Sequence, residues 1–485
     1  MKHAVQLIVY PDSMGGNLNE LSLVIDEFFP SMFSGLHILP FFPSAGDRGF
    51  SPKTYFEVEQ SFGTWEDIKQ LGSKYDILAD IMVNHISYKS EYVQDYLKNG
   101  EASPYNDFFI DLNKIWEDGV VRQADIDNMF LRRVKPYSTY QSEAFGEKTL
   151  WTTFGKEEPS EQVDLDINSA DVRKYFVDIF AHFAVNNINI VRLDAVGYII
   201  KKMGTSCFFV EPDIWEFMQW IAELASQHEI TLLPEVHSHY SIQLKLSENG
   251  FWIYDFILPY RILEALLFND GRALAEYLKS RPHNQFTMLD CHDGVPVKPD
   301  LDGLLDSKDA QKVVHVCLSR GANLSKIISE KHRAEDGFDV HQIRGTYYSL
   351  LDCDDDAYIA ARALQLFTPG IPQIYYVGLL AGKNDQERVD ETGEGREVNR
   401  KNYTKNEVKE AVNQPVVQRL LKLIDFRNVY EAFDGEFEVL DAQENELRLC
   451  WTKANKCCVL IVDVATNRSV IEYTGENGTT LQYFV

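Results

Sequence analysis

Apolar residues in this chain are grouped into short runs that alternate with longer amphipathic stretches. Eight of the short runs are apolar on both faces, which is typical of parallel strands covered by helices. These runs lie at residues 5–10, 36–40, 77–82, 189–193, 231–235, 253–258, 286–290 and 373–376. The amphipathic stretches have a helical period and lie at residues 21–33, 65–75, 171–185, 214–227, 272–279, 357–367 and 416–426. Eight strands that alternate with helices predict an α/β fold, the (β/α)8 TIM barrel.

Two intervals between the predicted strands are too long for one loop and one helix. About 105 residues follow the third strand and about 80 follow the seventh, and segments of that length usually serve function or carry small domains. The tail contains short apolar runs separated by Asn, Gly and Asp, which predict a small antiparallel sheet. We therefore expect a barrel of residues 1–84, 167–293 and 355–432, insertions at 85–166 and 294–354, and a C-terminal β domain at 433–485.

The composition is that of a large folded chain. Of the 485 residues, 45% are hydrophobic and 12% are aromatic, which supports a sizeable core and argues against disorder. The net charge of −27 disfavours nucleic acid and anionic membrane surfaces as partners. No apolar stretch approaches the roughly 18 residues of a membrane span, and the N-terminus does not resemble a signal peptide.

The seven cysteines are odd in number and scattered, and their spacing is not that of a metal site. This pattern predicts reduced thiols and therefore a cytoplasmic protein. We expect a monomer or a homodimer, and neither a cofactor nor a metal.

Three carboxylates mark the candidate chemistry, because each follows its own strand-like run. Asp194 and Glu235 end the fourth and fifth runs, and Asp293 comes shortly after the seventh. The carboxyl ends of barrel strands converge on one face, where active sites form. Converging carboxylates perform retaining glycoside chemistry, as nucleophile, as acid and base, and as a stabiliser of positive charge. The alternative is that each acid is a helix N-cap or a solvated loop residue.

The segments around these acids resemble the four ordered motifs of the α-amylase superfamily, glycoside hydrolase family 13. These segments are residues 80–85, 191–195, the run ending at Glu235 and residues 292–293, and residues 162–166 resemble an auxiliary motif. A closer resemblance, to the sucrose phosphorylase branch, covers essentially the whole chain and is weakest in the tail. It rests on residues 5–8, 37–42, 46–50, 194–198, 235–238, 374–378 and 395–400.

The resemblance implies roles for the three acids. Asp194 would attack the sugar and form a β-glucosyl ester, with Arg192 keeping it ionised. Glu235 would protonate the leaving oxygen, which requires a raised pKa before the attack. Asp293 would bind sugar hydroxyls and stabilise the distorted ring. The other sugar contacts that the resemblance implies are Asp47, Phe50, His85, Phe154, Gln162, Tyr198, His237, His292 and Arg396.

Several of these residues also have a purely structural interpretation. His85 could be a hydrogen-bonded core histidine, and Arg396 could be a surface arginine. The aromatic residues Phe50, Phe154 and Tyr198 would more often belong to a core than to a site.

The two insertions carry residues that the resemblance relates to phosphate. In the family, an arginine of the first insertion and a residue of the second meet inorganic phosphate, with the histidine after the acid/base nearby, and those positions are Arg133, His341 and His237. Sucrose-type relatives have tyrosine where this chain has His341, and a histidine near phosphate can be cationic and donate. The complete set of acceptor and phosphate candidates is Arg132, Arg133, Lys135, Phe338, Asp339, His341, Gln342 and Arg344. The alternative is that the charged members of this set are solvated surface residues.

Together these features predict reversible phosphorolysis of sucrose 6′-phosphate to α-glucose 1-phosphate and fructose 6-phosphate. A subgroup of the branch acts on this substrate, and a second anionic group in the acceptor would explain the additional cations. The alternatives are phosphorolysis of plain sucrose, phosphorolysis of glucosylglycerol or glucosylglycerate, and hydrolysis of α-glucosides. A non-catalytic sugar-binding relative is disfavoured because all three acids are present.

Overall fold

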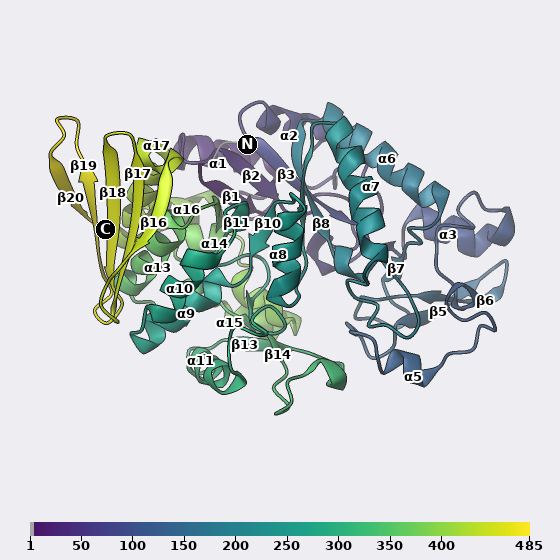
Figure 1. Cartoon of the computed structure of the whole chain (residues 1–485). Helices are drawn as coiled ribbons and strands as arrows, with labels where there is room; N and C mark the ends of the chain where they lie inside the picture. The colour runs from purple at the N-terminus through teal and green to yellow at the C-terminus, as the bar shows by residue number, and fades with distance from the viewer. Residues whose placement is uncertain (1–3) are drawn as a thin grey trace.

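The computed structural model describes residues 4–485, and eight parallel strands form its central sheet (Figure 1). The strands are β1 (Gln6–Val9), β2 (Gly35–Ile38), β3 (Asp76–Met82), β8 (Ile188–Asp194), β9 (Thr231–Pro234), β10 (Ile253–Asp255), β11 (Gln285–Thr287) and β15 (Ile371–Tyr375). They pair in the order β10-β11-β15-β1-β2-β3-β8-β9, and β9 lies against β10, which brings the two ends of the sheet together. Each strand overlaps a predicted run, so the predicted barrel is confirmed.

Some of the barrel helices begin at side-chain caps. Asn17 accepts a hydrogen bond from the backbone of Glu20 at the start of α1 (Leu18–Phe28), and Thr64 forms a capping box with Asp67 before α2 (Trp65–Gly72). The helix predicted at 21–33 ends early because Pro30 cannot continue it. The other predicted helices are present as α6 (Ala170–Val185), α7 (Asp213–Gln227), α10 (Arg272–Ser280), α13 (Asp355–Phe367) and α17 (Pro415–Val429).

Two barrel helices were not predicted, α8 (Tyr240–Glu248) and α9 (Leu258–Phe268). The run at 253–258 was read as one strand, but β10 ends at Asp255 and α9 begins at Leu258. The carboxylate of Asp255 accepts from the backbone N–H of Leu258 at 2.9 Å and so makes this turn. The apolar residues after Asp255 continue the run of β10 into the start of α9, so the sequence does not mark where the strand ends.

The first insertion contains α3 (Glu91–Asn99), a hairpin of β5 (Tyr137–Ser142) and β6 (Gly146–Trp151), and the pair β4 (His85–Ser87) and β7 (Gln162–Asp164). The second contains α11 (Ser307–Ser319) and a sheet of β12 (Val295–Pro296), β14 (Val340–Arg344) and β13 (Asn323–Lys326). Figure 1 shows the second insertion below the barrel and the first insertion to the right of the barrel.

The two insertions touch at several points, and one of these contacts is made by the hydroxyl group of Ser329. Ser329 donates to the carbonyl of Met129 at 2.8 Å and accepts from the backbone N–H of Leu131 at 2.9 Å. The rings of Phe130 and His332 pack edge to face beside this contact, with 5.0 Å between their centroids. We call these five residues the insertion interface.

The tail forms the predicted antiparallel sheet, drawn in yellow in Figure 1. Its strands pair in chain order and are β16 (Glu436–Leu440), β17 (Glu446–Lys453), β18 (Lys456–Asp463), β19 (Arg468–Thr474) and β20 (Thr480–Phe484). The sheet packs on α13, where the indole N–H of Trp451 donates to the carbonyl of Phe367 at 2.7 Å. The domain boundaries given above stay a prediction.

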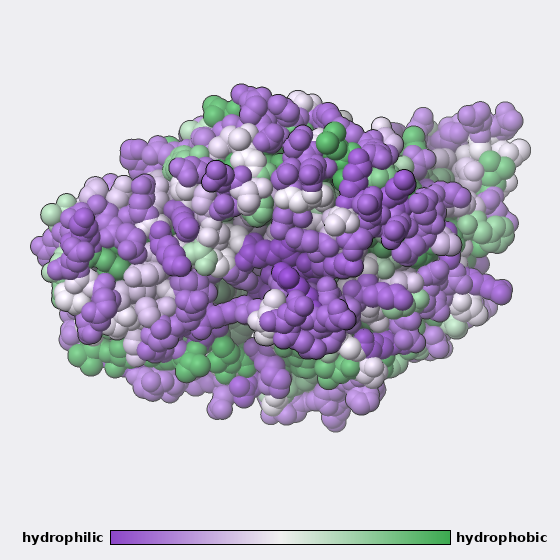
Figure 2. Space-filling model, turned by 180° about the vertical axis from the view of Figure 1, so that it is seen from behind, coloured by the Kyte–Doolittle hydropathy of each residue, from purple (hydrophilic) through white to green (hydrophobic). Residues whose placement is uncertain are grey.

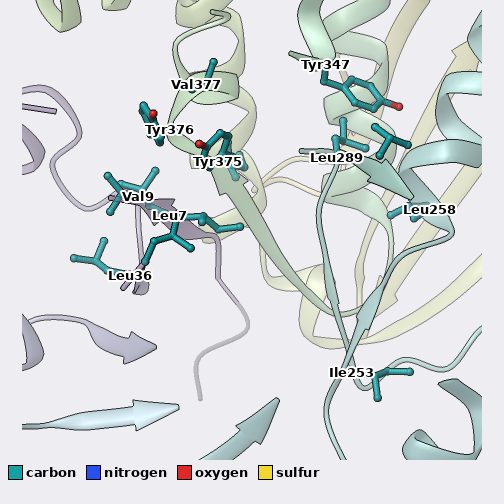
Figure 3. Packing of buried hydrophobic residues seen from close by; sticks show 14 of the residues in the cluster. Leu7, Val9, Leu36, Ile253, Leu258, Leu289, Tyr347, Tyr375, Tyr376 and Val377 are labelled. Carbon is teal, nitrogen blue, oxygen red and sulfur yellow. The ribbon is translucent and has the colours of Figure 1, made fainter. Parts of the chain in front are cut away.

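The core is continuous from the barrel to the helices around it. Figure 3 shows Leu7 and Val9 of β1 together with Leu36 of β2, close to Tyr375, and all four are fully buried. A second cluster draws its members from β3, β8, β9, β10, β11 and β15, namely Leu78, Ile190, Leu233, Tyr254, Phe286 and Ile371. This cluster fills the barrel, so catalytic groups have room only beyond the strand ends.

Candidate active site

The three predicted acids lie on one face of the barrel and line one pocket. Asp194 is the last residue of β8, Glu235 directly follows β9, and Asp293 lies in the segment after β11. The space inside the pocket, including the part that is open to solvent, is about 670 Å³. The parallel register of β8 and β9, which pairs Leu193 with Pro234, sets Asp194 and Glu235 side by side.

A single guanidinium joins two of the acids. Arg192 Nη1 is 2.6 Å from Asp194 Oδ1 and 2.6 Å from Asp80 Oδ1, while its Nη2 is 3.3 Å from Glu235 Oε1. The backbone N–H of Ala195, a residue with left-handed φ of 56°, donates to Glu235 Oε2 at 3.3 Å. The expected contact between Arg192 and Asp194 is therefore present, and the nucleophile and acid candidates share one cation.

The pKa values of the two acids differ from the expected order. Burial raises the pKa of Asp194 to about 7, with Glu235 adding to this effect and Arg192 opposing it. Burial would also raise the pKa of Glu235, but Arg192 and His237 outweigh it and lower that pKa to about 2. The two acids lie close together and share Arg192, so they titrate as a pair, and burial together with their mutual repulsion retains one proton on that pair.

The distal end of the pocket carries two ion pairs of Arg396. Arg396 Nη1 is 3.1 Å from Asp47 Oδ2, and Arg396 Nε is 3.3 Å from Asp293 Oδ1. Although burial opposes ionisation, Arg396, His292 and Arg400 hold the pKa of Asp293 well below its usual range. Asp293 is therefore a fixed anion beside the nucleophile.

Aromatic and polar residues complete the wall as predicted. The ring of Phe50 stacks on His292 with 4.8 Å between centroids, and its carbonyl contacts His85 Nε2 at 3.0 Å and accepts from Gln162 Nε2 at 3.2 Å. Phe154 lies edge to face on Tyr198 with 5.0 Å between centroids. Among residues 4–485, no partner is found for the buried atoms His85 Nδ1, Gln162 Oε1 and His292 Nδ1. Sugar hydroxyls could pair with such atoms.

The two insertions add Arg132 and His341 above the acids. Arg132 Nη1 contacts His341 Nε2 at 3.0 Å, and the ring of His341 is 5.7 Å from that of His237. His341 was expected to be cationic, but burial, together with Arg132 and His237, holds its pKa well below the usual range. In this pocket His341 is therefore neutral and accepts from Arg132. Gln342, its neighbour on β14, also lines the pocket.

A vestibule of about 1,040 Å³ adjoins the pocket and is rich in cations. The cations that line it are Arg132, Lys156, Lys326, Arg344 and Arg396, and the acids are Asp47, Glu161 and Glu394. Within the described chain, Arg344 has no ion-pair partner and its Nε makes no hydrogen bond. Burial, assisted by nearby Arg396, lowers the pKa of Arg344 to about 10.

Four of the acceptor candidates lie away from the pocket. Arg133 donates to Ser138 and Thr152 at 3.0 Å each and pairs with Glu158, and Lys135 pairs with the same glutamate at 3.2 Å. Asp339 pairs with Lys326 at 3.2 Å, and Phe338 belongs to the main hydrophobic core. The arginine that faces the acids is Arg132.

Several residues around the acids were not among the predicted site residues. Ala195 and Phe208 line the pocket, and Asp80 contacts Arg192. Asp300 contacts His237, which in turn contacts Glu235. Asp80 and Ala195 carried a sequence signal, because they lie in the motifs at 80–85 and 191–195. Among residues 4–485 there is no group of three or more His, Cys, Asp or Glu side chains placed to hold a metal ion.

Comparison with known proteins gives three findings. The family "Alpha amylase, catalytic domain" matches residues 32–249. The chain is 58% identical, over the full length of both proteins, to "Sucrose 6(F)-phosphate phosphorylase" of Thermoanaerobacterium thermosaccharolyticum, and 39% identical to "Sucrose phosphorylase" of Streptococcus mutans, over 98% of each. A crystal structure of sucrose 6F-phosphate phosphorylase from Thermoanaerobacter thermosaccharolyticum superimposes with a TM-score of 0.99 at 58% identity and covers 100% of this chain and 99% of that one.

Proposed function

Because the chain belongs to the α-amylase family, and within it to the sucrose phosphorylase branch, we propose that it cleaves sucrose 6′-phosphate with inorganic phosphate. The products are α-glucose 1-phosphate and fructose 6-phosphate. The 58% identical relative carries the name of this activity over its whole length, and the barrel site contains the acids that the activity requires.

The first displacement forms an ester at Asp194. A carboxylate oxygen of Asp194 attacks the anomeric carbon while the bond to the fructosyl oxygen breaks, and Glu235 gives that oxygen a proton. Burial and the mutual repulsion of the two acids keep one proton on the pair below about pH 7. In the step proposed here Glu235 carries that proton when the donor is bound, and His237 contacts Glu235 at 3.1 Å.

The second displacement restores the configuration. A phosphate oxygen attacks the same carbon, the bond to Asp194 breaks, and Glu235 takes the proton that the phosphate releases. Two inversions leave the α configuration in the product. Asp293 and Arg396, with Asp47, hold the hydroxyls of the glucosyl unit during both steps.

The contact between Arg132 and His341 is the observation that favours a phosphorylated acceptor. It places a guanidinium at the acceptor side of the pocket, and Arg344 adds a second cation that is not neutralised by a carboxylate. In a chain of net charge −27, such unpaired cations call for an anionic ligand. The phosphate of the fructosyl unit is that ligand in our proposal.

Initial rates on a donor panel test the proposal. With inorganic phosphate present, we expect kcat/KM for sucrose 6′-phosphate to exceed that for sucrose by about tenfold or more, since a hydrogen bond to a charged group is worth about 1.5–3 kcal/mol. The readout is release of α-glucose 1-phosphate, and Asp194→Asn serves as the inactive control. A preference for plain sucrose would contradict the phosphorylated acceptor, and cleavage independent of phosphate would contradict phosphorolysis.

The location and the assembly of the protein are finer points of the same proposal. We place it in the cytoplasm, as a monomer or a homodimer. Support for the location comes from the cysteines, all seven of which are free, including Cys450 and Cys457 with their sulfur atoms 3.7 Å apart. No helix among residues 4–485 is both long and apolar enough to cross a membrane.

A further inference from the structure

Asp300 is a buried carboxylate that lies behind the acid candidate. It belongs to the second insertion, 63 residues from His237, and its side chain is 1% exposed. Both of its oxygens face His237 Nδ1, at 3.1 and 3.3 Å. Its neighbours Val297 and Leu301 are buried and apolar, so the carboxylate is held in an environment that favours pairing with a cation.

His237 is fixed by contacts from three elements. Its Nε2 is 3.1 Å from Glu235 Oε1, and its ring stacks on Phe256 with 4.0 Å between centroids. With Asp300 at Nδ1, each ring nitrogen faces a carboxylate. Only the imidazolium form can donate from both nitrogens, so this geometry selects the charged histidine.

The other groups near His237 oppose its charge but do not cancel it. His341 on β14 is neutral and faces it at 5.7 Å, and Arg132 lies beyond His341. Burial disfavours the imidazolium, but Asp300 and Glu235 outweigh burial and raise the pKa of His237 to about 10. His237 therefore stays protonated across the physiological range.

We propose that Asp300 is a positioning residue that keeps His237 oriented and cationic, and that this cation selects inorganic phosphate over water at the second displacement. The proposal rests on the phosphorylase function proposed above. A phosphate anion has to approach three acidic side chains, so it requires a fixed cation, whereas water does not. In both reactions the new bond forms at the anomeric carbon as the bond to Asp194 breaks, and the released proton goes to Glu235.

The variant Asp300→Asn tests this proposal because it keeps the shape and removes the charge. At pH 8 we expect the KM for phosphate to rise about tenfold or more, as when a charge-assisted hydrogen bond is lost. The share of glucose among the products should increase. Hydrolysis of α-glucosyl fluoride without phosphate, which reports on ester formation and its attack by water, should stay within about threefold of the wild type.

The pH dependence of the KM for phosphate shows whether Asp300→Asn acts through the charge of His237 or through a change in the shape of the site. In the variant, His237 should titrate near the ordinary histidine value of about 6.5, so its charge disappears as the pH rises above 7. The ionisation of phosphate changes the KM of the variant and of the wild type by the same factor. The ratio of the two KM values is therefore independent of that ionisation. This ratio should be close to one at pH 5.5 and should grow up to pH 8. A ratio that does not change with pH would overturn the proposal.

Three further variants complete the design. Asp302→Asn is the matched control, because Asp302 is on the same segment but is exposed and pairs with Lys298. Asp300→Glu keeps the charge and should restore part of the preference for phosphate. In a His237→Gln background, Asp300→Asn should add nothing, and an additive effect would contradict action through His237.

The outcomes remain distinguishable if a variant is unstable or if the proposed function fails. Should Asp300→Asn not fold, His237→Gln alone has to raise the KM for phosphate about tenfold or more at pH 8, in a ratio to the wild type that does not change with pH, and its failure to do so overturns the inference. A wild-type enzyme that does not depend on phosphate contradicts the proposed function. A phosphate-dependent wild type with an unaffected Asp300→Asn contradicts only the role of Asp300.

Discussion

Arg132 and Arg133 are adjacent in the chain but have opposite surroundings. Arg133 is held by two hydroxyls and Glu158 within the first insertion, while Arg132 reaches His341 and lines the pocket with the acids. Sequence resemblance pointed to Arg133 as the phosphate contact, because it compares positions and does not see which way a side chain turns. At the scale of single residues, Arg132 is therefore the better candidate for the acceptor phosphate.

Arg132→Met should separate the two kinds of acceptor. In the direction of synthesis from α-glucose 1-phosphate, we expect the KM for fructose 6-phosphate to rise by about 10- to 100-fold, the cost of one contact between charged groups. The KM for unphosphorylated fructose should change little. His341→Tyr should act in the same direction, because it removes the acceptor that orients Arg132.

The control for this prediction is Lys135→Met, since Lys135 belongs to the same segment but pairs outward with Glu158 at 3.2 Å. Equal effects of Arg132→Met on the two sugars would assign Arg132 to inorganic phosphate or to structure. An effect of Lys135→Met as large as that of Arg132→Met would contradict the assignment that Arg132 faces the pocket while Lys135 points away from it.

At the scale of elements, the strands could be predicted and much of the insertions could not. The barrel strands are apolar on both faces, which a single sequence reveals. Helix α9 escaped prediction because the apolar run of β10 continues into its first residues, and the hairpin of β5 and β6 lies in an interval where the sequence supplied no elements. Asp194, Glu235 and Asp293 follow strands and could be found, whereas Asp300 acts through a contact across 63 residues that no local motif encodes.

The insertion interface sets the position of β14 over the pocket. Ser329→Ala removes the hydroxyl that bridges Met129 and Leu131 and leaves their backbone groups unpaired. We expect the free energy of unfolding to fall by about 1–3 kcal/mol, and the KM for fructose 6-phosphate to rise because Arg132 and His341 come from opposite sides of this interface. Urea unfolding and acceptor kinetics measure the two effects.

Ser280→Ala is the control for the interface, because the Ser280 hydroxyl only donates to carbonyls of its own helix, α10. If Ser329→Ala lowered stability without any change in acceptor KM, the interface would be structural and would not position the acceptor site.

At the scale of the whole molecule, the barrel and the C-terminal sheet share one core. The indole of Trp451 bonds to Phe367 of α13, and its ring lies 5.8 Å from that of Phe433. Elsewhere the surface shown in Figure 2 is largely hydrophilic, in keeping with the high net charge. The apolar junction of the two parts is therefore covered, and we expect them to unfold together.

Trp451→Ala should lower the free energy of unfolding by about 3–5 kcal/mol, as for other buried tryptophans. Calorimetry should still show a single transition, at a lower temperature, because the sheet has no separate support. The exposed Phe484, 72% accessible on β20, provides the control, and Phe484→Ala should change stability by about 0.5 kcal/mol or less. Two resolved transitions in either protein would contradict a shared core.

The vestibule and the pocket have five residues in common: Asp47, Arg132, Phe154, Gln162 and Arg396. The fructose 6-phosphate that leaves and the inorganic phosphate that enters therefore pass through the same opening. Neither anion can enter while the other occupies this opening. Each turnover therefore consists of two separate binding events, with the glucosyl-enzyme as the intermediate between them. Fructose 6-phosphate that accumulates would then compete with inorganic phosphate for the glucosyl-enzyme and would regenerate the starting donor. The ratio of the concentrations of these two anions would therefore set the net direction of the reaction.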